Sequence, residues 1–363
     1  MQFIDLKTQY KKMDKEVDSA IKKVLEHGQY INGPEITELE KTLADYVGVK
    51  HSVVCSSGTD ALLMALMALG VGAGDEVITT PFTFIATAEV IALLGAIPVF
   101  VDIDEKTYNL NPDLIKKKIT KKTKAIMPVS LYGQCADYDA INAIAAESSI
   151  PVIEDAAQSF GASYKGKKSC GLTEIGCTSF FPSKPLGAYG DGGAMFTNND
   201  EHAKLFKQIR EHGQDRRYNH PVLGLNARMD SIQAAILITK MKQFPSEVSA
   251  REKTGKRYSE LLKNVVTTPY VAPDNLSVYA QYTVLVENRD QFAGKLKDAN
   301  VPTAVHYPIP LHLQPVFSYL GQGKGSYPVS EKIAEKVISL PMHPYLSEAE
   351  QDEVVAAIKQ AVK

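Results

Sequence analysis

The chain has 363 residues, which is enough for two domains of ordinary size and a large buried core. Its 40 Lys and Arg residues and 42 Asp and Glu residues leave a net charge of −2, so no strong basic field favours nucleic-acid binding. No apolar stretch approaches the ~20 residues that span a bilayer, and no secretion signal opens the sequence. The four cysteines form no CxxC motif, so we expect a protein of the reducing cytoplasm.

The first 200 residues predict an alternation of helices and strands. Residues 10–26 have helical apolar spacing, and a second helix is expected from Pro34 to Gly48. Short apolar runs and helical patterns then alternate, which indicates a mostly parallel sheet covered by helices on both faces. The expected strands are Ser52–Cys55, Glu76–Thr79, Pro98–Val101, Ala125–Val129, Pro151–Ile153, Cys177–Phe181 and Ala194–Thr197, and the expected helices between them are Asp60–Leu69, Phe84–Leu94 and Tyr138–Glu147.

The pattern changes after about residue 229. Helix is predicted from Met229 to about Lys263, and an α+β arrangement follows it. The expected elements are the strand Gln281–Val286, the helix Asp290–Asn300, the strand Thr303–Tyr307 and the helix Ser347–Val362. We therefore expect a large α/β domain over residues 1–245 and a smaller α+β domain over residues 246–363.

Two patterns resemble ligand sites but each lacks a necessary residue. The stretch Gly161–Lys168 is close to a P-loop, but it ends on a lysine where that motif needs a hydroxyl for Mg²⁺. His306 and His312 have no cysteine or carboxylate partners at zinc spacing. The sequence thus predicts neither a nucleotide P-loop nor a metal site.

A possible phosphate site lies at the turn Ser56–Asp60, between a predicted strand and a predicted helix. Such a turn offers free backbone N–H groups and the positive end of the helix dipole to an anion. Serine and threonine are also common helix caps, so the turn has an ordinary structural explanation as well.

An acidic pair ends the predicted strand Pro151–Ile153, where Glu154 and Asp155 follow directly. A carboxylate at the carboxyl end of a parallel strand can point into the cleft above the sheet and hold a protonated ring nitrogen. The alternative is that Asp155 caps the next helix.

A lysine in a stiffened segment follows. Pro182 and Pro185 flank Lys184, which comes after an aromatic strand and before the glycine-rich turn Gly190–Gly193. A lysine held rigidly in a cleft of low dielectric has a lowered pKa and can form a Schiff base. Most lysines are instead solvated surface charges. A phosphate turn, a strand-end aspartate and a rigid lysine are together the parts that a pyridoxal phosphate enzyme needs.

The sequence resembles the DegT/DnrJ/StrS family of pyridoxal-phosphate-dependent sugar aminotransferases. The matching stretches are Gly33–Glu35, Ser57–Leu62, Thr83–Ala88, Glu154–Gln158, Ser183–Lys184, Gly190–Gly193, Asn226–Asp230 and His306–Pro308. The resemblance implies the aspartate-aminotransferase-like fold, also called PLP fold type I, and a homodimer with shared active sites. Some relatives have histidine in place of the lysine and act as dehydratases, so Lys184 favours amino transfer.

The resemblance also implies a role for individual residues. Lys184 matches the Schiff-base lysine, and Asp155 matches the partner of the pyridine nitrogen. The other expected cofactor contacts are Gln158 at the ring oxygen, Phe84 against the ring face, Gly58, Thr59 and Ser179 at the phosphate, and Asn226 reaching the phosphate from the second subunit.

A closer similarity points to the branch of the family that acts on UDP-2-acetamido-2-deoxy-3-oxo-glucuronate with glutamate as donor, for bacterial O-antigen sugars in lipopolysaccharide. This similarity lies in Pro128–Asp137, His212–Tyr218, Ser277–Thr283 and His306–Leu311. The chain has only seven arginines, all after residue 209, and a guanidinium reads a carboxylate bidentately. We expect Arg228, then Arg217, to contact an acidic group of the substrate, with further contacts from His306 and Tyr307, although Arg216 and Arg217 could equally lie in a solvated loop.

Three functions remain open from the sequence. The first is a 3-aminotransferase of UDP-keto sugars, the second a 4-keto nucleotide-sugar aminotransferase, and the third a non-catalytic relative that binds pyridoxal phosphate or a sugar. A regulatory relative would not need a chemically competent Lys184, so a reversible spectral change with glutamate distinguishes it from an enzyme.

Overall fold

Two sheets joined edge to edge form the centre of the protein, which a computed structural model describes over residues 1–363. One sheet has the strand order β1-β9-β8-β5, and the other has the order β3-β2-β4. Parallel bridges from Ile126 to Val152 and from Val129 to Asp155 join β4 to β5. All neighbours are parallel except those of β9, which confirms the expected mostly parallel sheet. The strands are β1 (His51–Cys55), β2 (Glu76–Thr79), β3 (Ile97–Phe100), β4 (Thr123–Ile126), β5 (Ile153–Asp155), β8 (Ile175–Ser179) and β9 (Gly193–Thr197).

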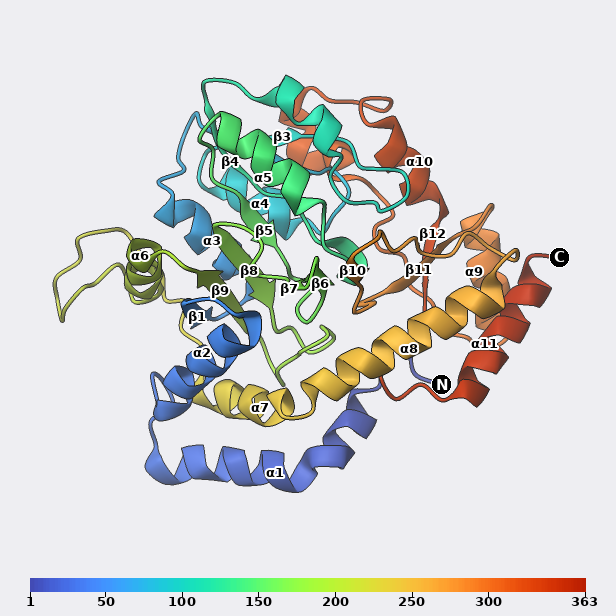
Figure 1. Ribbon diagram of the computed structural model, residues 1–363, viewed down its shortest axis with the longest axis horizontal. Helices are drawn as coiled ribbons and strands as arrows, with labels where there is room; N and C mark the ends of the chain where they lie inside the picture. Colours follow the sequence, from blue (N-terminus) through green and yellow to red (C-terminus); the bar gives the residue numbers. More distant parts are fainter.

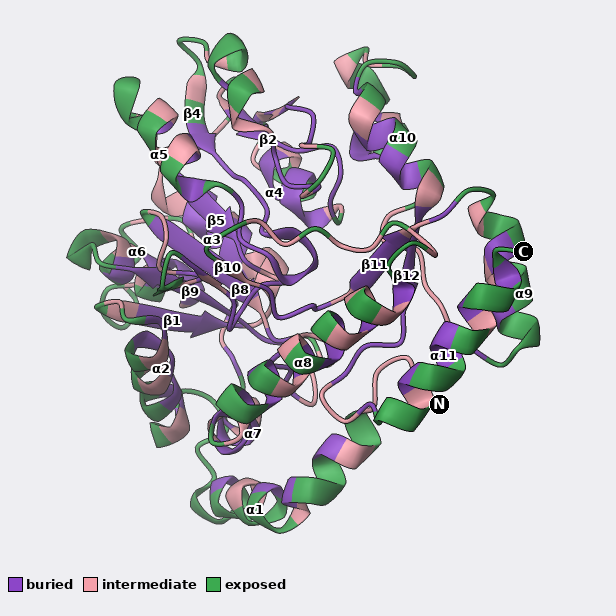
Figure 2. Ribbon diagram, turned by 45° about the vertical axis from the view of Figure 1, so that its right-hand side comes forward, coloured by how far each residue is buried: buried purple, intermediate pink, exposed green.

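Helices cover this sheet, as Figure 1 shows. The helix α3 packs against β8 and β9, while α1 and α2 both pack against α7. Figure 2 shows the central strands buried and the covering helices exposed along one face, which is the amphipathic arrangement that the apolar spacing predicts. The helices of this part are α1 (Leu6–His27), α2 (Pro34–Val47), α3 (Gly58–Ala68), α4 (Ala86–Leu93), α5 (Tyr138–Glu147), α6 (Asp200–Arg210), α7 (Ser231–Met241) and α8 (Phe244–Leu262). No helix combines the length and the apolar character that a membrane span requires.

The C-terminal part forms a smaller layer beside the end of α8 (Figure 1). Its sheet pairs β11 (Tyr282–Leu285) antiparallel with β12 (Val337–Leu340). Its helices are α9 (Arg289–Asp298), α10 (Pro328–Lys336) and α11 (Glu348–Ala361). A second small sheet joins β10 (Asn275–Leu276), β6 (Ser163–Tyr164) and β7 (Lys167–Lys168), so residues on both sides of the expected boundary share a ladder. The division between residues 245 and 246 stays a prediction.

The expected strand Thr303–Tyr307 is wrong. Only Ala304 bridges to Ser339 there, and the strand that pairs with β11 is β12. Pro302 and Pro308 bracket the segment and cannot donate ladder hydrogen bonds, which explains its irregular backbone. The sequence reading also missed α6, α10 and β12. The helix expected from Met229 begins at Ser231 and is broken into α7 and α8 between Met241 and Phe244.

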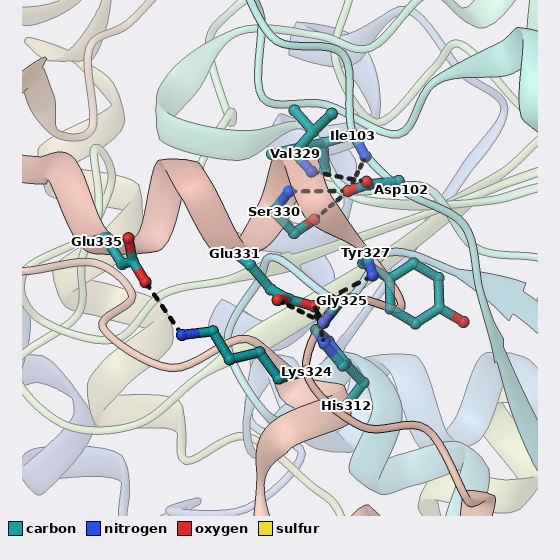
Figure 3. Close-up of polar contacts among 10 residues, drawn as sticks. All are labelled: Asp102, Ile103, His312, Lys324, Gly325, Tyr327, Val329, Ser330, Glu331 and Glu335. Atoms are coloured by element: carbon teal, nitrogen blue, oxygen red, sulfur yellow. Dashed lines mark hydrogen bonds and ion pairs between the residues drawn. The ribbon is translucent and has the colours of Figure 1, made fainter.

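The segment from His306 to Tyr327, called here the 306–327 segment, is tied to the large sheet by two buried carboxylates (Figure 3). Asp102, just after β3, accepts hydrogen bonds from the backbone N–H groups of Val329 and Ser330 at 2.9 Å and thereby caps α10. Glu331 on α10 accepts from the N–H groups of Gly325 and Tyr327 and from His312 Nε2 at 2.9 Å. These contacts fix the first turn of α10 to the end of β3 on one side and to the 306–327 segment on the other.

Candidate active site

Asp155 lies buried at the carboxyl end of β5. The Thr87 hydroxyl donates a hydrogen bond to Asp155 Oδ2 at 2.8 Å, and the N–H of Ala157 donates to Oδ1 at 3.2 Å. Burial raises the pKa of Asp155, and the Thr87 hydroxyl, the Ala157 N–H and the positive charge of Lys184 act against that rise. The residues that follow form turns and no helix, so the alternative of a helix cap is wrong.

Lys184 lies half-buried in the irregular segment between β8 and β9. Its backbone N–H donates to the carbonyl of Phe181 at 2.9 Å, and the Ala188 N–H donates to the carbonyl of Phe180 at 2.7 Å. Burial lowers the pKa of Lys184, while the charge of Asp155 acts in the opposite direction. The structure therefore brings the two predicted key residues within electrostatic reach of each other.

A wall of polar and aromatic groups from both parts of the chain lies beside Asp155. Gln158 Nε2 donates to the Tyr307 hydroxyl at 3.0 Å, and Gln158 Oε1 accepts from the Tyr132 N–H at 2.9 Å. The Phe84 ring lies 6.0 Å from the Tyr307 ring and is 53% exposed, although it is a large apolar group. His306 is held through Nδ1 by the Ser339 hydroxyl at 2.9 Å, and its carbonyl accepts from the Tyr132 hydroxyl.

The predicted phosphate turn lies at the N-terminus of α3. Ser57 caps the helix by accepting a hydrogen bond from the Asp60 N–H at 3.0 Å, so the ordinary structural explanation of this turn is confirmed. The backbone at Gly58 approaches Ser179 so closely that a Cβ there would be 2.5 Å from Ser179 Cβ. The turn and the end of β8 thus form one cradle, with Thr59 in the first turn of the helix.

The donor set suits pyridoxal phosphate. The cradle at Gly58 and Ser179 combines a helix N-terminus, glycine backbone and a hydroxyl, which match a phosphate. Asp155 supplies a buried carboxylate for a ring N–H, Phe84 leaves an aromatic face open, and Lys184 supplies the amine. The residues present therefore fit each end of the cofactor.

The structure does not bring every predicted residue into this cluster within one chain. Asn226 and Arg217 are exposed, and Arg217 instead stacks on Tyr218 with its guanidinium 5.0 Å from the ring centre. Arg228 lies 3.6 Å from Glu211 through Nη1, and its Nε is buried with no hydrogen-bond partner. The Ser56 N–H donates to the carbonyl of Ala227 at 2.9 Å, so the segment that carries Arg228 borders the phosphate turn.

Three residues of the site were missed from the sequence. Thr87 lies in Thr83–Ala88, one of the stretches that match the family, but no neighbouring residue in the sequence indicates its hydrogen bond to Asp155. Tyr132 contacts both Gln158 and His306, and Glu211 pairs with Arg228. The partners of all three residues are distant in the chain or belong to another helix, strand or loop, so the local sequence does not reveal these contacts. A surface groove of about 1060 Å³ lies elsewhere, between the segment around Glu105 and the C-terminal part, and contains none of the predicted site residues.

Comparison with known proteins agrees with this geometry. Residues 11–359 match the DegT/DnrJ/EryC1/StrS aminotransferase family. The chain belongs to this family. A relative from Pseudomonas aeruginosa, UDP-2-acetamido-2-deoxy-3-oxo-D-glucuronate aminotransferase, is 58% identical over 99% of both chains.

Solved structures of the family share the fold throughout. DesV of S. venezuelae, in complex with a ketimine intermediate, superposes with a TM-score of 0.98 at 37% identity over 100% of this chain and 98% of the other. NtdA from Bacillus subtilis, with bound cofactor PMP, gives 0.90 at 31% identity over 99% of this chain and 83% of the other. The expected fold, the class of enzyme and the cofactor of the family, pyridoxal phosphate, are confirmed.

Proposed function

We propose that this aminotransferase converts UDP-2-acetamido-2-deoxy-3-oxo-glucuronate to the 3-amino sugar with glutamate as the amino donor. The 58% identity with the relative of that name, over nearly the whole of both chains, carries the choice of substrate. The juxtaposition of Lys184, Asp155 and the Gly58–Ser179 cradle supports the chemistry. The product belongs with sugars of the bacterial O-antigen.

Bound pyridoxal phosphate supplies an electron sink that accepts the electron pair left when the α-proton of glutamate is removed. Lys184 would anchor the cofactor and, once released, move that proton through its Nζ as general base and then general acid. Its lowered pKa suits this task, because a lower pKa favours the neutral amine, which is the form that can accept a proton. Asp155 would hold the ring nitrogen in its protonated form through a buried charge-assisted hydrogen bond.

The other cofactor contacts would divide between the ring and the phosphate. Gln158 would meet the ring oxygen and Phe84 the ring face, while Gly58, Thr59 and Ser179 would hold the phosphate. Asn226 is exposed on this chain, which supports the proposal that it reaches the phosphate of a partner's site in a homodimer.

On the sugar side, His306 and Tyr307 line the wall opposite Phe84. Burial and the charge of Lys184 lower the pKa of His306, so we assign it a neutral hydrogen-bonding contact near pH 7. An acidic group of the sugar then needs an arginine, and Arg228 has an unpaired buried Nε to offer. Arg217 remains the second candidate.

The test begins with the purified holoenzyme. Borohydride reduction should leave a pyridoxyl group on the peptide that contains Lys184, and glutamate alone should change the absorption spectrum reversibly. A panel of UDP-keto sugars should then show which sugar regenerates the original spectrum and yields an amino sugar. Labelling of another lysine would refute the site, and a preference for a 4-keto sugar would select the alternative substrate class.

A further inference from the structure

A buried lysine outside the predicted site contacts the segment that carries Lys184. Lys240 on α7 is only 2% exposed, and its ammonium donates a hydrogen bond to the carbonyl of Gly187, three residues after Lys184. The same ammonium lies 4.9 Å from the centre of the Tyr189 ring. No other hydrogen-bond partner satisfies it within the chain.

The charge of Lys240 is costly in this place. Burial is the main cause that lowers its pKa to about 8; Glu247 acts against that shift, and Arg251 adds to it. Glu247 lies within 4 Å of neither cation and instead bonds to Gln9 and Tyr345. A buried ammonium without a paired carboxylate weakens the fold relative to an apolar side chain of similar size. Stability therefore does not explain its presence.

A second polar group on the same face of α7 contacts the same segment. Gln233 lies two helical turns before Lys240, and its Oε1 accepts a hydrogen bond from the Tyr189 N–H at 2.9 Å. The core side of α7 is mostly apolar, with Ala234 and Leu237 in the core, and its other buried polar side chains bond elsewhere: Ser231 accepts from the Gly33 N–H, and Thr239 donates to the Ala235 carbonyl of its own helix. Gln233 and Lys240 are thus the two side chains of α7 that bond to the backbone from Gly187 to Tyr189.

This contact reaches Lys184 through a short stretch of backbone. The segment has no ladder hydrogen bonds between Phe181 and Gly187, and the backbone at Gly187 packs so tightly that a Cβ would meet the Pro182 carbonyl at 2.3 Å. The proposed function requires the Lys184 amine to leave the cofactor and return in each cycle. Such a side chain is effective only if its backbone stays in place, since small displacements of a reacting group cost large factors in rate.

We propose that Lys240 and Gln233 are positioning residues, which fix the backbone of Gly187–Tyr189 and thereby the place of the Lys184 amine. The inference rests on the role that the proposed function gives to Lys184. It concerns this chain's own residues and does not depend on which sugar is the substrate.

The test compares Lys240→Met with the matched control Lys242→Met, since Lys242 is an exposed lysine at the end of the same helix. In Lys240→Met we expect kcat with the best keto sugar to fall roughly 10- to 100-fold, while its KM changes little. The rate at which the apoprotein attaches added pyridoxal phosphate to Lys184, trapped with borohydride, should fall with it. Tm should stay unchanged or rise, because an unpaired buried charge is removed.

A second pair of variants keeps the inference testable if Lys240→Met does not fold. Gln233→Leu removes the acceptor for the Tyr189 N–H, whereas Gln233→Glu keeps an acceptor oxygen at that position and should restore most of the lost rate. Wild-type kcat and attachment rate in the variants would overturn the inference, as would a kcat loss that only follows a lowered Tm. Borohydride labelling at a lysine other than Lys184 in the wild type would instead overturn the proposed function.

Discussion

Thr87 and Asp155 are 68 residues apart in the chain, and the hydroxyl of the first donates a 2.8 Å hydrogen bond to the buried carboxylate of the second. The bond joins the start of α4 to the end of β5, across the edge where β4 and β5 meet. It favours the ionised form of Asp155 against the effect of burial. In the proposed mechanism only that ionised form holds the ring nitrogen protonated.

The first prediction is that Thr87→Val lowers the rate of amino transfer by about 10- to 100-fold, because the variant loses one hydrogen bond to a charged group. Without the hydroxyl, the pKa of Asp155 rises further, so the acid limb of the pH–rate profile should move to higher pH. Steady-state kinetics between pH 5 and 9 would check this, and Thr87→Ser should restore the wild-type profile. An unshifted acid limb would mean that Thr87 does not act on Asp155.

In Asp155→Asn we expect a far larger loss of amino-transfer rate than in Thr87→Val, with the cofactor still bound.

The second prediction concerns the contact between Asp102 and α10 (Figure 3). Asp102→Ala leaves the N–H groups of Val329 and Ser330 without their acceptor in a buried place, which should cost about 1–3 kcal/mol of unfolding free energy. The control is Glu335→Ala on the same helix, which removes only the exposed pair with Lys324 and should change stability by less than about 0.5 kcal/mol. Urea unfolding of both variants measures the difference. Equal effects would show that Asp102 does not hold α10.

Glu331 adds a dependence on pH to the same region. Burial raises its pKa, but the N–H groups of Gly325 and Tyr327 and the His312 ring more than offset that effect, so the pKa lies below its usual 4.5. A carboxyl whose pKa is lowered by folding stabilises the native state above its unfolded pKa and loses that contribution as the pH falls through its native pKa. The wild type should therefore lose stability below about pH 4.5 more steeply than Glu331→Gln. Parallel unfolding curves from pH 7 to 3 would contradict this.

Features set by a few consecutive residues could be predicted from the sequence, whereas contacts between residues far apart in the chain could not. The acidic pair directly after a short apolar strand, the cap at Ser57 and the stiff segment around Lys184 are properties of a few consecutive residues, and the sequence predicts them. The partners of these residues are not local. Thr87 and the Asp102 contacts with α10 exist only because the sheet and the 306–327 segment place distant residues side by side. The residue pattern of Thr303–Tyr307 predicts a strand. The prolines on either side of it cannot donate ladder hydrogen bonds, so only a single bridge forms there.

The third prediction tests whether two chains share each active site. A Lys184→Ala chain and an Asn226→Ala chain are each expected to be inactive as homodimers. If Asn226 serves the partner's site, a heterodimer has one site with both changes and one site with neither. An equal mixture after subunit exchange should thus recover roughly a quarter of wild-type activity. Exchange must be confirmed separately, for example by mass spectrometry of the intact dimers, and no recovery after confirmed exchange would count against sharing.

The fourth prediction concerns recognition of the substrate's carboxylate. Arg228 offers a buried Nε without a partner, and its contact with Glu211 is long, at 3.6 Å. A guanidinium can meet a carboxylate through two parallel charge-assisted bonds, which a lysine cannot reproduce. Truncating one partner of a buried charged pair costs about 2–5 kcal/mol, so Arg228→Lys should lower kcat/KM for the 3-keto uronate by a large factor. Arg289→Lys, on α9 and bonded to the Ala334 carbonyl, is the control and should have little effect.

A change of substrate gives the same interaction a second, independent measurement. The 3-keto uronate is compared with the matching 3-keto sugar that carries CH₂OH in place of the carboxylate. If Arg228 reads the carboxylate, the wild type should strongly prefer the uronate, and Arg228→Lys should lose most of that preference while its kcat/KM for the neutral sugar stays nearly constant. Because the two changes remove the two partners of one contact, their effects should not add. Equal use of both sugars by the wild type would exclude carboxylate recognition, and an unchanged preference in Arg228→Lys would move the role to Arg217.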